Sequence, residues 1–107
     1  MRLSRAEEKA VEELSAVLRS RFGAREVLLY GSAARGDMDA ESDIDLLVVL
    51  PEVNWEIEKQ IIGLCFDAQL EHGRVFSAAC FGEHDIRNGP LKDSPLVRHA
   101  RSQGRPV

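Results

Sequence analysis

The chain has 107 residues, of which 44% are hydrophobic and 30% charged, as in soluble globular proteins. This length leaves room for one domain, so we expect residues 1–107 to form a single domain. The net charge of −4 argues against a broad basic surface for nucleic acid, and the apolar runs are too short to span a bilayer. No secretory signal precedes the first predicted helix, so we expect a cytoplasmic protein that binds neither nucleic acid nor membrane.

A helix is predicted from Leu3 to Phe22. Ser4 and Glu7 have the spacing of a capping box, and Gly23 is placed to end the helix. Its apolar residues recur on one face that should pack against a core: Val11, Leu14, Leu18 and Phe22. The next apolar run, Glu26 to Tyr30, is predicted to be the first strand.

A turn of small residues, Gly31-Ser32-Ala33-Ala34, follows this strand directly. Glycine allows backbone N–H groups to approach a ligand closely, and Ser32 lies near the N-cap of a short predicted helix, where free amides attract phosphate. A Walker A loop is excluded because no lysine lies between Lys9 and Lys59. The turn therefore indicates a phosphate-binding loop of another kind.

Two aspartates begin the next predicted strand, which runs from Asp43 to Leu50 and ends before Pro51. Alternate side chains of a strand share a face, so Asp43 and Asp45 should lie on one side, about 6.6 Å apart along the strand. Such a pair can hold one or two Mg²⁺ ions with phosphate oxygens and water. For an isolated pair, a turn residue followed by a solvated strand end is the alternative.

A second long helix is predicted from its Asn54 cap to about Glu71, where His72-Gly73 ends it. Trp55 and Phe66 either extend the buried side of this helix or are exposed to a partner. Both cysteines, Cys65 and Cys80, lie in apolar contexts and are predicted to be buried.

The C-terminal part begins with a third predicted strand, Arg74 to Phe81. Gly82 to Asp93 is predicted to be a turn and a mobile loop, and Ser94 to Gly104 a capped helix. These elements predict an α/β (α+β) fold, a small mixed sheet flanked by helices, with the aspartate strand in its middle or next to it.

The combination of Gly31-Ser32, ten intervening residues and Asp43-x-Asp45, with strands on both sides, resembles the minimal nucleotidyltransferases of the polymerase-β superfamily. The resemblance is carried by residues 27–50. It implies the nucleotidyltransferase fold, with Gly31 and Ser32 holding the triphosphate and Asp43 and Asp45 ligating Mg²⁺. For Arg35 it leaves two readings open, neutralisation of phosphate charge or a solvated side chain.

The resemblance also implies the reaction. An acceptor hydroxyl attacks the α-phosphorus of a nucleoside triphosphate, taken as ATP by family likeness, at a two-metal site. Catalytic members carry a third carboxylate on the strand after the long helix, but Arg74–Phe81 has none. The nearest acids are Glu83 and Asp85, either of which could replace it. Without it, one metal would be held weakly, which predicts slow transfer or nucleotide binding without turnover.

Relatives of this size are often encoded beside a small all-helical HEPN (higher-eukaryote-and-prokaryote nucleotide-binding) protein, with which they form toxin–antitoxin pairs. The resemblance therefore implies an antitoxin that transfers AMP from ATP to a hydroxyl group of its HEPN toxin partner. One alternative is a weak or inactive nucleotide-binding module that neutralises its partner by binding alone. A second is a small-molecule nucleotidyltransferase of the antibiotic-modifying kind.

Overall fold

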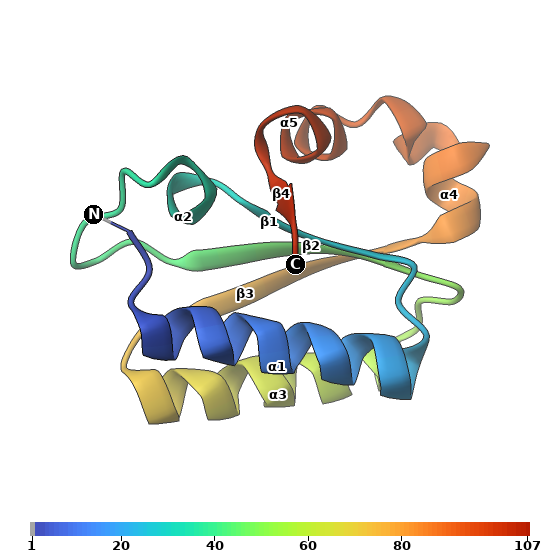
Figure 1. Ribbon diagram of the computed structural model, residues 1–107. Coiled ribbons are helices and arrows are strands. Elements are labelled where there is room, and N and C mark those ends of the chain that lie inside the picture. Colours follow the sequence, from blue (N-terminus) through green and yellow to red (C-terminus); the bar gives the residue numbers. More distant parts are fainter. Residues whose placement is uncertain (1) are drawn as a thin grey trace.

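The computed structural model describes residues 2–107 and forms a sheet with helices on both faces (Figure 1). The order of elements along the chain is α1 (Arg5–Phe22), β1 (Glu26–Tyr30), α2 (Ser32–Arg35), β2 (Ile44–Leu50), α3 (Trp55–His72), β3 (Phe76–Gly82), α4 (Glu83–Arg87), the 3₁₀ helix η1 (Pro90–Asp93), α5 (Pro95–Gln103) and β4 (Arg105–Pro106).

Among residues 2–107, the sheet has four strands in the order β3-β2-β1-β4. Strand β1 runs antiparallel to both β2 and β4, whereas β2 and β3 are parallel and are connected through α3. The predicted mixed sheet flanked by helices is therefore confirmed. The aspartate strand, β2, is an interior strand of this sheet.

One face of the sheet is covered by α1 and α3, which lie side by side beneath it (Figure 1). Apolar side chains of both helices pack there against alternate residues of the strands, forming the larger core: Val11, Leu14, Leu18, Val27, Leu29, Ile44, Leu46, Val48, Leu50, Ile61, Cys65 and Phe76, among others. Because the opposite face of β2 is also largely covered, this strand is an almost continuous apolar run.

The predicted helix caps are present. The Glu7 backbone N–H donates to Ser4 Oγ at 3.1 Å, and the Ser4 N–H donates to Glu7 Oε1 at 2.9 Å, so Ser4 lies outside α1 and the helix begins at Arg5. Asn54 Oδ1 accepts from the Ile57 N–H at 2.9 Å and caps α3. At its other end, α3 stops where Gly73 adopts a left-handed conformation.

The segment predicted as a mobile loop, Gly82 to Asp93, instead contains α4 and η1, so that prediction is wrong. Ile86 of α4 is buried in a second core with Val97 and Ala100 of α5, against Leu28 and Leu47 of the sheet. A five-residue helix is not stable through its local sequence, and here this burial stabilises it. The predicted helix from Ser94 to Gly104 is α5, although Ser94 makes no side-chain capping bond.

Strand β4 was not anticipated. After α5 the chain passes through Gly104 and pairs with β1, with Arg105 opposite Leu29. A Cβ on Gly104 would lie 2.4 Å from the carbonyl oxygen of Ala100 and 2.7 Å from that of Leu29, so only glycine fits. This close approach between α5 and the sheet is invisible in a local sequence pattern.

Several large apolar side chains of α3 are exposed. Trp55 and Phe66, left open between core and surface, are 66% and 54% exposed. Ile62 and Leu70 lie on the same side of the helix and are also exposed. Of the cysteines, Cys65 is buried as predicted, whereas Cys80 is half-buried. Among residues 2–107, no helix combines the length and apolarity needed to cross a membrane.

Candidate functional site

The centre of the candidate site is a row of three residues across the sheet. Asp45 of β2 lies opposite Tyr30 of antiparallel β1 and beside Ser77 of parallel β3. Residues in register on neighbouring strands point to the same face, so the three side chains share the face opposite α1 and α3. The C-terminal end of β1 therefore meets the N-terminal ends of β2 and β3 at Asp45.

The same face is covered farther along the strands. Leu28 and Leu47 lie in the second core, beneath α4 and α5. This cover is incomplete at the Asp45 row: Tyr30 still packs against the second core, but Asp45 and Tyr30 remain half-buried and Ser77 is exposed. Asp43, predicted to begin this strand, lies just before β2, close enough to Asp45 for their charges to interact, and is also exposed. The packing of α4 and α5 thus leaves one end of this face open to a ligand.

Gly31 forms the turn above this row. Its φ of 72° and ψ of −154° fall in a region that essentially only glycine occupies. A Cβ at this position would lie 3.0 Å from Asp45 Oδ2. Glycine is therefore required twice, by the backbone conformation and by the closeness of the carboxylate. The structure brings Gly31 and Asp45 together, as the sequence motif predicts.

Ser32 begins α2 immediately after this glycine, so Gly31 and not Ser32 is the N-cap residue. The helix has only four residues, and the N–H groups of Ala34 and Arg35 both donate to the Gly31 carbonyl at 3.2 Å. The Ser32 carbonyl accepts from the N–H groups of Gly36 and Asp37 at 2.9 and 3.2 Å, which closes the turn. Ser32 is thereby held beside Gly31 at the start of the turn.

The environment of Asp45 disfavours its negative charge. Burial raises the pKa of Asp45 above its usual value, and the neighbouring charge of Asp43 raises it further. Burial also raises the pKa of Tyr30, with a second contribution from Asp45. A carboxylate that is half-buried beside another carboxylate costs free energy when ionised. A bound cation would reverse the sign of this interaction.

The two carboxylates fit Mg²⁺ as an incomplete oxygen site. Among residues 2–107, no group of three or more His, Cys, Asp or Glu side chains is placed to hold a metal. Mg²⁺ usually keeps several water ligands and binds through one or two carboxylates together with substrate phosphates. Asp43 and Asp45 supply that pair, and the open end of the face leaves room for the other ligands.

The position beside Asp45 on β3 is occupied by Ser77, which has no charge. Neither acid proposed as a replacement lies there. Leu50 pairs with Gly82, so Glu83 and Asp85 follow β3 at the opposite end of the sheet, about 16 Å from Asp45 along the strands. Glu83 is moreover paired with Arg25 at 3.1 Å. The idea that Glu83 or Asp85 completes the site is therefore wrong.

Arg35 is paired with an acid other than the two site carboxylates. Its Nε forms an ion pair with Asp37 Oδ2 at 3.1 Å, and its side chain is 43% exposed. It also lines a hollow of about 330 Å³ together with Arg2 and Arg105, and neither Asp43 nor Asp45 lines this hollow. Of the predicted site residues, the structure groups Gly31, Ser32, Asp43 and Asp45 and leaves Arg35 on the far part of α2.

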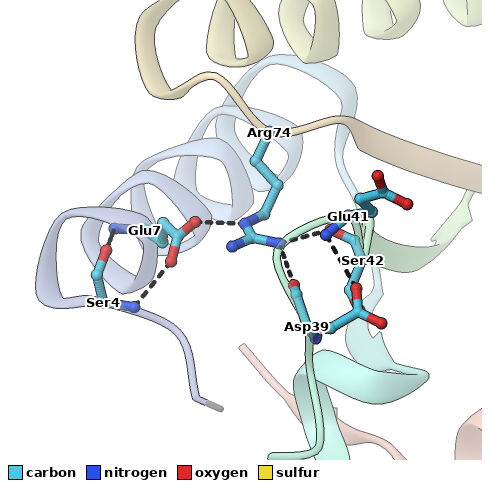
Figure 2. Close-up of polar contacts among 6 residues, drawn as sticks. All are labelled: Ser4, Glu7, Asp39, Glu41, Ser42 and Arg74. Carbon is cyan, nitrogen blue, oxygen red and sulfur yellow. Dashed lines mark hydrogen bonds and ion pairs between the residues drawn. The ribbon is translucent and has the colours of Figure 1, made fainter.

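The loop between α2 and β2 carries Asp43 into the site and is tightly bonded. Met38 is buried in the core, and Asp39 Oδ1 accepts from the Glu41 N–H at 2.9 Å and from Ser42 Oγ at 3.1 Å. These bonds lower the pKa of Asp39. Figure 2 shows a guanidinium that reaches this loop from beyond α3, that of Arg74. Its partners are distant in sequence, so no local pattern pointed to Arg74.

The fold and this site together define a nucleotidyltransferase. The model of the nucleotidyltransferase domain family matches residues 11–83, and the chain belongs to this family. A protein of Methanocaldococcus jannaschii provisionally named a protein adenylyltransferase is 40% identical over 74 residues, 67% of this chain and 70% of that protein. A second protein of the same organism with the same provisional name is 41% identical over 51 residues, 48% of this chain and 50% of that protein. The protein adenylyltransferase MntA of Thermococcus cleftensis is 47% identical over 36 residues, 34% of this chain and 36% of that relative.

Proposed function

We propose that this nucleotidyltransferase is Mg²⁺-dependent and transfers AMP from ATP to a hydroxyl group of a partner protein. The observation that carries the proposal is the grouping of Asp43 and Asp45 beneath the Gly31 turn on an open end of the sheet. Relatives named protein adenylyltransferases support a protein acceptor.

In this proposal, Asp43 and Asp45 are the metal ligands, and Gly31 and Ser32 bind the triphosphate through backbone N–H groups and the serine hydroxyl. Bound Mg²⁺ would neutralise phosphate charge and orient the reacting oxygens. The acceptor oxygen forms a bond to the α-phosphorus, and the bond from that phosphorus to the α–β bridging oxygen breaks. Pyrophosphate leaves with the electron pair, and the hydroxyl proton is released to water.

Arg35 has a lesser role in the proposal. Its ion pair with Asp37 and the exposure of its side chain support the reading of a solvated side chain over that of a direct phosphate ligand. An arginine released from Asp37 by a bound nucleotide could still reach a phosphate.

A second candidate function follows from Ser77. With a neutral residue beside Asp45, one of the two metals would be bound weakly, which favours slow transfer or none. The chain would then be a nucleotide-binding module that neutralises its partner by forming a complex. The glycine turn and both aspartates are retained, which supports the enzyme over this alternative.

For the partner, we propose a small helical HEPN toxin encoded nearby, with this chain as the antitoxin. The exposed apolar side chains of α3 support a protein partner, because exposed apolar side chains grouped on one side of a helix mark interaction surfaces. These side chains are Trp55, Ile62, Phe66 and Leu70.

The test is intact-mass spectrometry of the product of the neighbouring gene after incubation with this protein and Mg-ATP. A mass gain of one AMP on the partner, absent with the Asp43→Ala/Asp45→Ala variant, is the expected result. Formation of a stable complex without a mass gain on either chain would overturn the transfer reaction and favour the binding module. Transfer of AMP to a small hydroxylated compound in place of the partner would point to the antibiotic-modifying class.

A further inference from the structure

Arg74 lies between α3 and β3, and its side chain is only 15% exposed. Its Nε forms an ion pair with Glu7 Oε2 of α1, whose side chain is 13% exposed. Taking an ion pair partly out of water costs free energy, and further hydrogen bonds to the guanidinium offset part of that cost. The hydrogen bonds at the other end of the guanidinium therefore indicate the role of this ion pair.

That end holds the loop that leads to the metal carboxylates (Figure 2). Arg74 Nη1 donates to the carbonyl oxygen of Ser42 at 2.7 Å and to that of Asp39 at 3.2 Å. One guanidinium thus joins two segments that are far apart in sequence, the start of α1 and the loop before β2.

Glu7 is itself fixed. Its Oε1 accepts from the Ser4 N–H at 2.9 Å in the capping box, and its Oε2 is left for Arg74. Burial alone would raise the pKa of Glu7, but its hydrogen bonds to Ser4 and Arg74 outweigh burial and lower it. Glu7 is therefore ionised at neutral pH and anchors the guanidinium to the rigid start of α1.

The contact with Ser42 bears directly on Asp43. The Ser42 carbonyl belongs to the planar peptide unit that ends at the Asp43 Cα, so fixing this oxygen fixes one side of Asp43. On the other side, the Ile44 N–H donates to the Val75 carbonyl at 2.9 Å. Asp43 itself is exposed, and like-charge repulsion from Asp45 would otherwise favour its movement away.

We propose that Arg74 is a positioning residue that holds Asp43 beside Asp45 in the geometry needed to bind a divalent cation. The inference rests on the proposed function, in which this pair binds Mg²⁺. Arg74 does not contact the cation. It acts by reducing the conformational freedom that Asp43 loses on binding, so its removal weakens cation affinity in a chain that remains folded.

The first measurement is Mn²⁺ binding by electron paramagnetic resonance, with Mn²⁺ in place of Mg²⁺, at a temperature well below unfolding of every variant. We expect Arg74→Met to weaken Mn²⁺ binding about tenfold, and Arg74→Lys, which keeps the charge but not the planar fork, to be intermediate. Arg25→Met is the matched control, because it removes an arginine whose ion pair with Glu83 lies at the far end of the sheet. Its Mn²⁺ affinity should equal that of the wild type.

The second measurement is hydrogen exchange of residues 39–43 in the metal-free protein. Exchange should become at least tenfold faster in Arg74→Met and stay unchanged in Arg25→Met. If Arg74→Met fails to fold, the same measurements are made on Arg74→Lys and Glu7→Gln. Both substitutions weaken the interaction between positions 7 and 74 without removing it. Ile61→Val, a core substitution in α3 outside the loop, shows whether lower stability alone changes Mn²⁺ affinity.

The two measurements separate the possible failures. A folded Arg74→Met protein with wild-type Mn²⁺ affinity overturns the positioning role, as does an equal loss in Ile61→Val. If wild-type protein and Asp43→Asn bind Mn²⁺ equally weakly, the metal site of the proposed function is wrong, and the inference fails with it. In that case, faster exchange of the loop in Arg74→Met would show that the error lies in the metal site and not in the loop contact.

Discussion

A Cβ placed on Gly31 would lie 3.0 Å from Oδ2 of Asp45, so the glycine turn and the carboxylate are in direct contact. A ligand bound at this turn would therefore lie near Asp45. This contact connects the two halves of the sequence motif, the small-residue turn and the aspartate pair, in one place.

Gly31→Ala should disrupt both the turn and the site. The required φ of 72° and ψ of −154° costs an alanine about 1–3 kcal/mol, and the close contact with Asp45 adds to this. We expect a lower melting temperature and loss of AMP transfer. The control is Gly63→Ala in α3, where no atom lies within 4 Å of the new Cβ, and which should raise stability by about 0.5–1 kcal/mol. Equal melting temperatures for the two variants would contradict the strained turn.

Asp45→Asn should change how stability depends on pH. Because burial and Asp43 raise the pKa of Asp45, the folded state binds this proton more tightly than the unfolded state does. In metal-free wild type, this residue should therefore reduce the free energy of unfolding as pH rises from its ordinary pKa of 3.8 through the raised value. At pH 7 the asparagine variant should melt about 2 °C higher than the wild type.

Saturating Mg²⁺ provides the control for this prediction. If Asp45 is a ligand, the ion stabilises the wild type and not the variant, so the order of the two melting temperatures should reverse. Thermal denaturation followed by circular dichroism, with and without Mg²⁺, checks both signs. An unchanged order in the presence of Mg²⁺ would count against Asp45 as a ligand.

Ser77→Asp should strengthen metal binding. Ser77 lies beside Asp45 in the parallel register of β2 and β3, where a carboxylate would face the same open end of the sheet. We expect Mg²⁺ or Mn²⁺ affinity to rise on the order of tenfold and AMP transfer to become faster. Without metal, the third negative charge should lower the melting temperature. Asparagine is similar in size to aspartate but neutral, so Ser77→Asn should show neither effect. Calorimetric titration with Mn²⁺ distinguishes the two variants.

The two thiols should react slowly in the folded protein. Burial raises the pKa of Cys65 to about 11, and burial together with Glu58 and Cys65 raises that of Cys80 to about 11. At pH 8 the fraction of reactive thiolate should be about 100-fold smaller than for a thiol with the ordinary pKa of 9.0. Alkylation of the folded protein by iodoacetamide, followed by mass spectrometry, should therefore be about 100-fold slower than alkylation of the protein unfolded in guanidinium chloride. Rapid alkylation of the folded protein would contradict the raised pKa values of the two thiols.

The sequence by itself determined the elements whose signals are local. Capping residues and one-sided apolar spacing predicted α1 and α3 to within two residues at each end. Alternation predicted that Asp43 and Asp45 share one side of the strand, although β2 begins only at Ile44, and the glycine after β1 marked the turn next to Asp45. These features depend on residues within a few positions of one another, so a pattern in the chain is sufficient to predict them.

Tertiary structure decided what depends on distant segments. Helix α4 exists because Ile86 is buried against α5 and the sheet, and β4 exists because Gly104 allows the chain to approach Leu29. Only the register of β2 and β3 places Ser77 beside Asp45 and sends Glu83 to the other end of the sheet. The same register brings Arg74, just before β3, within hydrogen-bonding distance of the Ser42 carbonyl, just before β2. Strand register and burial arise from packing between segments far apart in the chain, and no local pattern encodes them.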